Sequence, residues 1–198
     1  GFDECDFAAE RCKEAEGGKD KDFIITHTGL FAADGNPTVL WDVLAEKCRK
    51  EDTFRKRLKI RLIGKTDEQI ISYLKSAGLE DNLEDMGYQP HSVAVEQQRT
   101  ASLLILPLRK EPEYKAVLPG KLFEYMASMR PILGIGQPDG AMGMIIGQTG
   151  TGAVIDWEDE STISAYVDRC WERHKLGALT AGDADISRYT RRNLTHRM

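Results

Sequence analysis

Cysteines are few in this chain, and none of them lies close to another. Cys5, Cys12, Cys48 and Cys170 are scattered over 198 residues, with no C-x-x-C pair and no accompanying histidines. This spacing argues against a zinc site. It favours reduced, unpaired thiols, and we therefore expect a cytoplasmic protein.

The chain also lacks long apolar runs, internal repeats and an excess of positive charge. No apolar run approaches the ~20 residues that a membrane-spanning helix needs. The formal net charge is −5 and the sequence pI is about 5.5, which argues against a general nucleic-acid binder. With 41% hydrophobic residues, the chain can bury one sizeable core, which fits one α/β domain or one domain with a short appendage.

Apolar runs that alternate with helical patterns indicate a parallel sheet. Strands are predicted over residues 23–28, 58–63, 83–87, 101–107, 131–135 and 152–155, with helical patterns between them and after residue 155. The alternation predicts an α/β fold with a Rossmann-like, doubly wound parallel sheet flanked by helices. Such sheets bind ligands at the carboxyl ends of their strands. The loops that should share this rim follow Gly29, Gly64, Gly87, Pro107 and Gly136.

The stretch 118–134 predicts a turn, a helix and a strand in close succession. Pro119-Gly120 forms the turn, and Arg130-Pro131 ends the helix. Lys121 lies in the first helical turn, where it opposes the helix dipole unless an anion offsets it. Glu124 follows one turn later and can accept two hydrogen bonds from a ribose diol. The combination predicts a nucleoside diphosphate at the helix start, and the alternative is a solvated lysine with an exposed glutamate.

The same stretch resembles a segment of the form P-G-K-L-x-E-Y-x-A-x-x-(R/K)-P-I in group 1 (retaining, family-4-type) glycosyltransferases of the GT-B fold. The matching positions are Pro119, Gly120, Lys121, Leu122, Glu124, Tyr125, Ala127, Arg130, Pro131 and Ile132. The resemblance implies the donor-binding C-terminal half of a hexosyltransferase. That enzyme would move a sugar from a nucleotide-diphosphate sugar to a glycan or lipid-linked acceptor, with retention, without a metal or another cofactor.

The resemblance also implies roles for particular residues. Glu124 would hold the donor ribose. Lys121 would bind the diphosphate together with the backbone amides near Gly120 and Leu122. Gly29, at the end of the first strand, would let a loop approach the phosphates, because a residue without Cβ leaves room for them.

The loop after the third strand resembles the segment of these enzymes that reads the nucleobase. Tyr88 or Gln89 would contact the base there, whereas His91 is better explained as a loop residue or a helix cap. No catalytic residue is assigned, because the catalytic-site histidine of the family comes from the N-terminal half.

Two features depart from the family pattern. Ala116 stands where the first glutamate of the E-x7-E motif is expected, and the nearby Glu111 and Glu113 are both candidates to replace it. The arginine and lysine that follow the first strand's glycine in the family have no clear match, so Lys121 would supply the phosphate-binding cation.

The two ends of the sequence are polar and charged. Residues 1–22 resemble the interdomain linker of these enzymes, which leaves 23–198 as the nucleotide-sugar-binding domain without its N-terminal acceptor domain. The C-terminus is basic, and either an anionic membrane surface or solvent can face it. Its arginines are Arg188, Arg191, Arg192 and Arg197.

Two other functions fit an α/β domain of this size. A sugar-nucleotide epimerase with a GT-B-like fold needs its own cluster of acidic residues and histidines, and the sequence offers none. A non-catalytic nucleotide-binding or interaction module needs an acidic cluster or a phosphate loop after the first strand, and 27–30 supplies neither. Nucleotide affinity that depends on Glu124 and Lys121 would separate the transferase from the interaction module.

Overall fold

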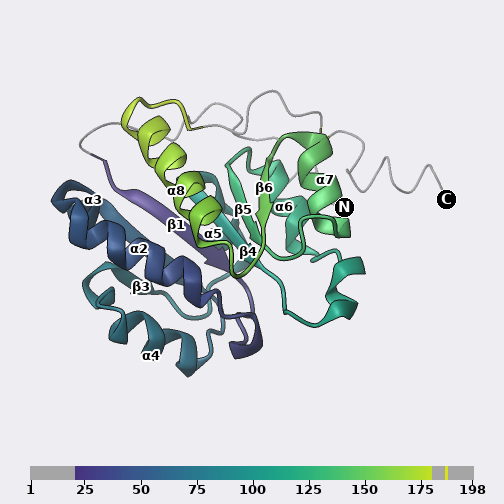
Figure 1. Cartoon of the computed structure of the whole chain (residues 1–198), viewed down its shortest axis with the longest axis horizontal. Helices are drawn as coiled ribbons and strands as arrows, with labels where there is room; N and C mark the ends of the chain where they lie inside the picture. Colours follow the sequence, from purple (N-terminus) through teal and green to yellow (C-terminus); the bar gives the residue numbers. More distant parts are fainter. Residues whose placement is uncertain (1–20, 180–185, 187–198) are drawn as a thin grey trace.

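The structure is a computed structural model, and it describes residues 21–179 and 186. Six parallel strands form one sheet in the order β3-β2-β1-β4-β5-β6 (Figure 1). The strands are β1 (Phe23–Thr28), β2 (Leu58–Ile63), β3 (Leu83–Asp85), β4 (Leu103–Pro107), β5 (Ile132–Ile135) and β6 (Gly152–Ile155). The predicted doubly wound parallel sheet is therefore confirmed, and the strand ends fall within two residues of the predicted ones.

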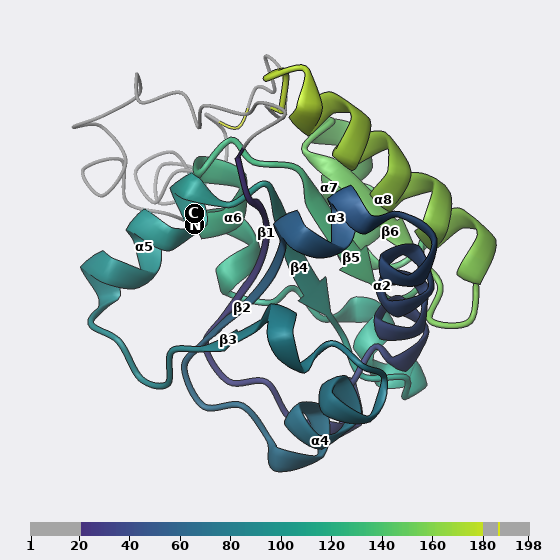
Figure 2. The same cartoon turned by 90° about the vertical axis from the view of Figure 1, so that its left-hand side faces the viewer.

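Helices cover both faces of this sheet. Figure 2 shows α5 and α6 on one face, and α2, α3 and α8 on the other. The α-helices are α2 (Thr38–Lys50), α3 (Asp52–Arg57), α4 (Glu68–Ser76), α5 (His91–Thr100), α6 (Lys121–Ala127), α7 (Ala141–Thr149) and α8 (Glu160–Lys175). Short 3-10 helices are η1 (Ala33–Gly35), η2 (Glu80–Asn82) and η3 (Pro112–Ala116).

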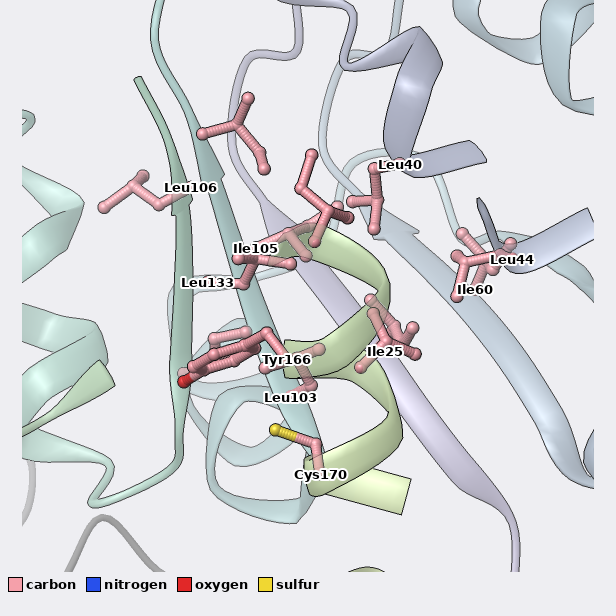
Figure 3. Packing of buried hydrophobic residues seen from close by; sticks show 14 of the residues in the cluster. Ile25, Leu40, Leu44, Ile60, Leu103, Ile105, Leu106, Leu133, Tyr166 and Cys170 are labelled. Atoms are coloured by element: carbon pink, nitrogen blue, oxygen red, sulfur yellow. The ribbon is translucent and has the colours of Figure 1, made fainter. Parts of the chain in front are cut away.

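The core lies between the sheet and these helices. Tyr166 and Cys170 of α8 lie beside Leu103 of β4, and Leu40 of α2 belongs to the same cluster of buried side chains (Figure 3). Leu103 is fully buried, and so are the next two residues of β4. A strand that is apolar on both faces needs helices on both sides, and each such side chain contributes roughly 1.5–3 kcal/mol when buried.

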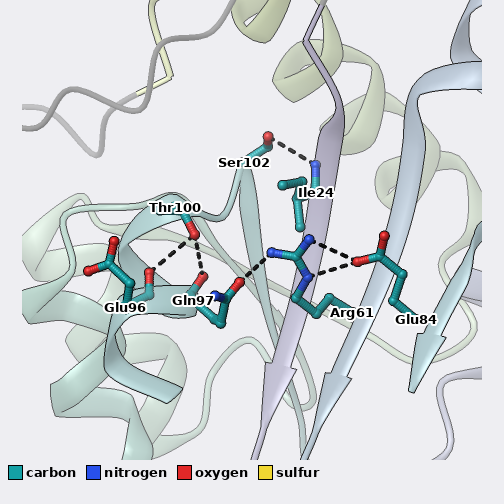
Figure 4. Close-up of polar contacts among 7 residues, drawn as sticks. All are labelled: Ile24, Arg61, Glu84, Glu96, Gln97, Thr100 and Ser102. Atoms are coloured by element: carbon teal, nitrogen blue, oxygen red, sulfur yellow. Dashed lines mark hydrogen bonds and ion pairs between the residues drawn. The ribbon is translucent and has the colours of Figure 1, made fainter. Parts of the chain in front are cut away.

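Polar contacts tie α5 to the sheet. Arg61 of β2 donates to Glu84 of β3 from Nε at 2.9 Å and to Gln97 of α5 from its terminal nitrogen (Figure 4). Ser102 accepts a hydrogen bond from the backbone amide of Ile24 at 3.0 Å, so the start of β4 is fastened to β1. These contacts span four strands and a helix, and they fix α5 on the face of the sheet beside β2.

Two helical segments differ from the sequence-based expectation. Helix α3 was not expected, because its six residues include a single apolar side chain, Phe54. Helix α6 ends at Ala127, earlier than the predicted stop at Arg130-Pro131, since Met129 adopts a left-handed conformation with φ of 57°. Proline disfavours a helical conformation in the residue before it, and the chain leaves the helix upstream of that point.

After the helix, the buried guanidinium of Arg130 holds the chain against two backbone carbonyl groups. It donates to the carbonyl oxygen of Arg99 at 2.6 Å and to that of Leu179 at 2.9 Å. Residues 1–20 of the predicted linker and the four arginines of the basic C-terminus lie outside the described residues.

Candidate functional site

The predicted site lies at the carboxyl edge of the sheet, beside β1. From β1 the chain builds outward through β2 and β3, and it then returns to build β4, β5 and β6 on the other side. Open parallel sheets bind their ligands at such a reversal of strand order. Arg109, two residues after β4, pairs with Asp34 of η1 at 2.9 Å and so links the two loops that leave this point.

Glycines let the loops at this edge approach each other closely. The amide of Gly29 donates to Ile63 at 2.7 Å, and the amide of Gly64 donates to Gly87 at 2.7 Å. Gly64 has φ of +116°, and a Cβ placed on it would lie 2.4 Å from the carbonyl oxygen of Gly29. The strand ends that the sequence places on one rim are therefore joined through their backbones.

Lys121, the first residue of α6, reaches back across this rim to β1. Its Nζ lies 3.3 Å from Nε2 of His27, and a Cβ built on Gly29 would lie 3.1 Å from the same Nζ. The side chain is partly buried, and burial lowers the pKa of the Lys121 amine to about 8, although the nearby carboxylate of Glu124 acts in the opposite direction. A cation held with so little solvation is poised to gain from an anionic ligand.

His27 was not predicted as a site residue, and it is the buried partner of that amine. Its side chain is 2% exposed, and its ring stacks on Phe31 with centroids 4.1 Å apart. Burial, and secondly the charge of Lys121, lower the pKa of His27 well below its ordinary range, so the imidazole is neutral. The sequence signal was a histidine at the carboxyl end of a buried strand, two residues before a glycine.

Tyr125 was predicted only as a match to the family motif, and it anchors α6 to β1. Its hydroxyl oxygen accepts a hydrogen bond from the amide of Thr28 at 2.9 Å. Gln98 of α5 donates to the hydroxyl of Thr28 at 3.1 Å and extends the buried network. Burial raises the pKa of Tyr125 to about 12, which keeps its hydroxyl protonated. Helix α6 therefore has a fixed position, although it is only two turns long.

Glu124 lies on α6 one turn after Lys121, and its side chain is partly exposed. Within the described residues, no hydrogen bond or ion pair holds its carboxylate. The group is close enough to Lys121 and Tyr125 to influence the pKa of both. A carboxylate with open acceptor sites beside a desolvated cation can bind a ligand that carries both hydroxyl groups and negative charge.

The remaining predicted residues of this turn differ in their surroundings. Gly120 is exposed, and a Cβ placed there would have open space within 4 Å. Leu122 is fully buried in the core, and its amide donates to the carbonyl oxygen of Pro119 at 3.0 Å. Leu122 therefore packs the helix against the sheet, and its amide already has a partner in this structure.

Tyr88 and Gln89 lie in the loop after β3, which is linked to the site through Gly87 and Gly64. Tyr88 is 89% exposed, so its ring is available for stacking. The side-chain amide of Gln89 donates to the carbonyl oxygen of Met86 at 2.8 Å. Among the described residues, no hydrogen bond joins either side chain to Lys121 or Glu124.

The loop before α6 carries the position where the motif departs from the family. Ala116, Glu111 and Glu113 are all exposed, in or beside η3. The loop is tied to the segment just before α7, because Lys115 pairs with Asp139 at 2.5 Å. In the part of the chain that the structure describes, no group of three or more acidic, histidine or cysteine side chains is arranged to hold a metal ion.

None of the described helices is both long enough and apolar enough to cross a bilayer.

The sheet order and the rim around β1 define an α/β domain of the Rossmann-like class. The sequence matches the family of glycosyl transferases group 1 over residues 22–173. The chain belongs to this family. No curated protein sequence is similar enough to match the chain.

Solved structures show that the fold is that of a GT-B glycosyltransferase C-terminal domain. The C-terminal domain of a group 1 glycosyltransferase, LpcC from Francisella tularensis, matches with a TM-score of 0.67 at 15% identity. That match covers 96% of this chain and 100% of LpcC's domain.

Longer glycosyltransferases match through part of their length. WaaG, involved in lipopolysaccharide biosynthesis, matches with a TM-score of 0.65 at 14% identity, over 90% of this chain and 48% of its own. A complex of S. aureus TarM with fondaparinux, α-GlcNAc-glycerol and UDP matches with a TM-score of 0.68 at 16% identity, over 91% of this chain and 35% of its own. The chain thus spans about half, or less, of these two proteins.

Proposed function

We propose that this domain binds the nucleotide-diphosphate sugar donor of a retaining glycosyltransferase. The observation that carries the proposal is the placement of the Lys121 amine against Gly29 at the strand-order reversal, with the carboxylate of Glu124 one turn away. The amine matches the diphosphate, and the carboxylate matches the two ribose hydroxyls. The presence of UDP in the TarM complex supports a ligand of this class for the fold.

Lys121 also has the chemistry that departure of the diphosphate requires. Negative charge grows on the diphosphate as the bond to the sugar breaks, and a preorganised cation stabilises that charge more when water is excluded. The amine is partly desolvated before any ligand binds. We therefore assign to Lys121 the charge neutralisation that metal ions provide in other transferases.

The acceptor, a glycan or a lipid-linked saccharide, would bind to a second domain that faces this rim. Group 1 family membership and the partial coverage of WaaG and TarM support that division of labour. The domain alone would then bind donors without transferring sugar. The free thiols of Cys48 and Cys170 agree with a cytoplasmic location.

A thermal-shift panel of nucleoside diphosphates and their sugars tests the proposal. A ligand at ~100 times its dissociation constant should stabilise the fold by roughly 2.7 kcal/mol. We expect one base to stand out, and Glu124→Ala to abolish the response. Glu96→Ala, which removes an exposed carboxylate from the middle of α5, is the matched control and should respond like the wild type. A response that survives in Glu124→Ala, or none from any nucleotide, would contradict the proposal.

A further inference from the structure

We propose that His27 is a positioning residue that holds the Lys121 amine in place for the diphosphate. This role rests on the donor-binding function proposed above and adds a residue to it. The contact between Nζ of Lys121 and Nε2 of His27, at 3.3 Å, is its starting point.

The contact selects one conformation of a flexible side chain. Lysine has a long aliphatic stem and many rotamers, so an unsupported amine would move over the rim. Here Nζ lies 3.3 Å from Nε2 of His27 and close to Gly29, where a Cβ would approach it to 3.1 Å. The amine therefore has a defined location before the ligand arrives, which reduces the ordering cost of binding.

The ring of His27 is itself fixed from two directions. Its backbone lies in β1, paired in register with Leu62 of β2. The imidazole stacks on Phe31 at an interplanar angle of 28°, and Phe31 contacts Trp41 with ring centroids 6.3 Å apart. A fully buried ring with these neighbours keeps Nε2 at one point of the rim.

The other ring nitrogen indicates that the Lys121 contact is the reason for a histidine here. Nδ1 of His27 is buried and has no hydrogen-bond partner among the described residues. Since the ammonium of Lys121 donates to Nε2, the ring proton is on Nδ1, where it stays unsatisfied. An unpaired buried N–H lowers stability, and an apolar side chain would avoid that loss. Among the described residues, the only polar contact of the ring is the one with Lys121.

The test compares His27→Gln with His27→Asn in the full chain. A glutamine amide can take the place of Nε2, whereas an asparagine amide reaches only as far as Nδ1. We expect His27→Asn to weaken binding of the preferred nucleoside diphosphate at least tenfold by calorimetry, and His27→Gln to stay within about threefold of the wild type. The corresponding nucleoside, which has no phosphate, should bind equally to all three. In a Lys121→Met background, the two His27 variants should bind the diphosphate alike.

Equal losses in both variants, or a parallel loss of nucleoside affinity, would overturn the proposal and leave His27 a packing residue. A second readout needs no nucleotide: acylation of the Lys121 amine across pH in the ligand-free chain. Loss of the Nε2 acceptor destabilises the ammonium, so the pH midpoint of acylation should be lower in His27→Asn and unchanged in His27→Gln. Identical midpoints would overturn the contact itself. If the midpoints differ while no nucleotide binds the wild type, the donor-binding function fails and the contact with Lys121 stands.

Discussion

Replacing Lys121 by methionine should change the pH dependence of stability in a predictable direction. The folded protein holds the Lys121 amine with a pKa of about 8, against an ordinary value of 10.5. Below pH 8 the amine is charged in both the folded and the unfolded state, and the burial of this charge opposes folding. As the pH rises from about 8 to 10.5 the folded state releases the proton first, so this contribution to stability grows and is complete above 10.5.

The size of the effect follows from the two pKa values. Each unit of difference corresponds to about 1.4 kcal/mol, so complete titration would favour the folded wild type by about 3 kcal/mol. Lys121 is only partly buried and solvent reduces the effect, so we expect about 2 kcal/mol between pH 7 and pH 10. His27 also lies beside the amine, but burial holds its pKa well below its ordinary range, so it does not titrate in that interval.

Urea unfolding of ligand-free wild type and Lys121→Met at these two pH values measures the effect. Subtracting the variant's free energy of unfolding from that of the wild type removes the contributions of the titratable groups that both proteins contain. When the pH is raised, we expect the free energy of unfolding of the wild type to increase by about 2 kcal/mol relative to that of Lys121→Met. A difference that stays constant, or that moves in favour of the variant, would show that the Lys121 amine is not a buried cation and would refute the reasoning.

Three further predictions concern the same rim. Tyr125→Phe leaves the amide of Thr28 without its acceptor. The substitution should therefore lower the free energy of unfolding by about 1–3 kcal/mol and the melting temperature by several degrees, measured by calorimetry. Gly64→Ala should lower the free energy of unfolding by at least about 3 kcal/mol, because the new Cβ collides with the backbone and φ is positive. Gly78→Ala, where φ is also positive but the surrounding space is open, should lower it by about 1 kcal/mol in urea unfolding. Equal losses would contradict the close approach of the two loops. Affinity for the diphosphate should fall up to tenfold per pH unit above about pH 8 in titration calorimetry, as Lys121 loses its proton, and a flat profile would contradict its role.

Much of the fold could be predicted because strong local patterns agree with the global arrangement. β4 is a continuous apolar run, and only a strand covered on both faces accommodates one. Helix α4 also has a local signal at its start, where the carboxylate of Asp67 accepts a hydrogen bond from the amide of Gln69 at 2.9 Å and caps the helix. By contrast, α3 has a weak apolar pattern and depends on tertiary packing of Phe54, which sequence periodicity does not report.

The sequence indicates part of the candidate site, but it does not indicate the contacts that hold this part in place. Lys121 and Glu124 were visible because they follow a turn that opens a helix. His27 and Thr28 escaped notice because their roles depend on contacts with residues more than 90 positions away. Parallel sheets bring such distant segments together, and a single sequence carries no signal for the pairing of a particular histidine with a particular lysine.

The most direct measurement is a crystal structure of the chain with the nucleoside diphosphate that stabilises it most. The account predicts phosphate oxygens within hydrogen-bond distance of Nζ of Lys121, and both ribose hydroxyls on the carboxylate of Glu124. The diphosphate would lie over Gly29 at the carboxyl edge of β1. A nucleotide bound elsewhere on the chain, or one whose phosphates avoid Lys121, would contradict the account.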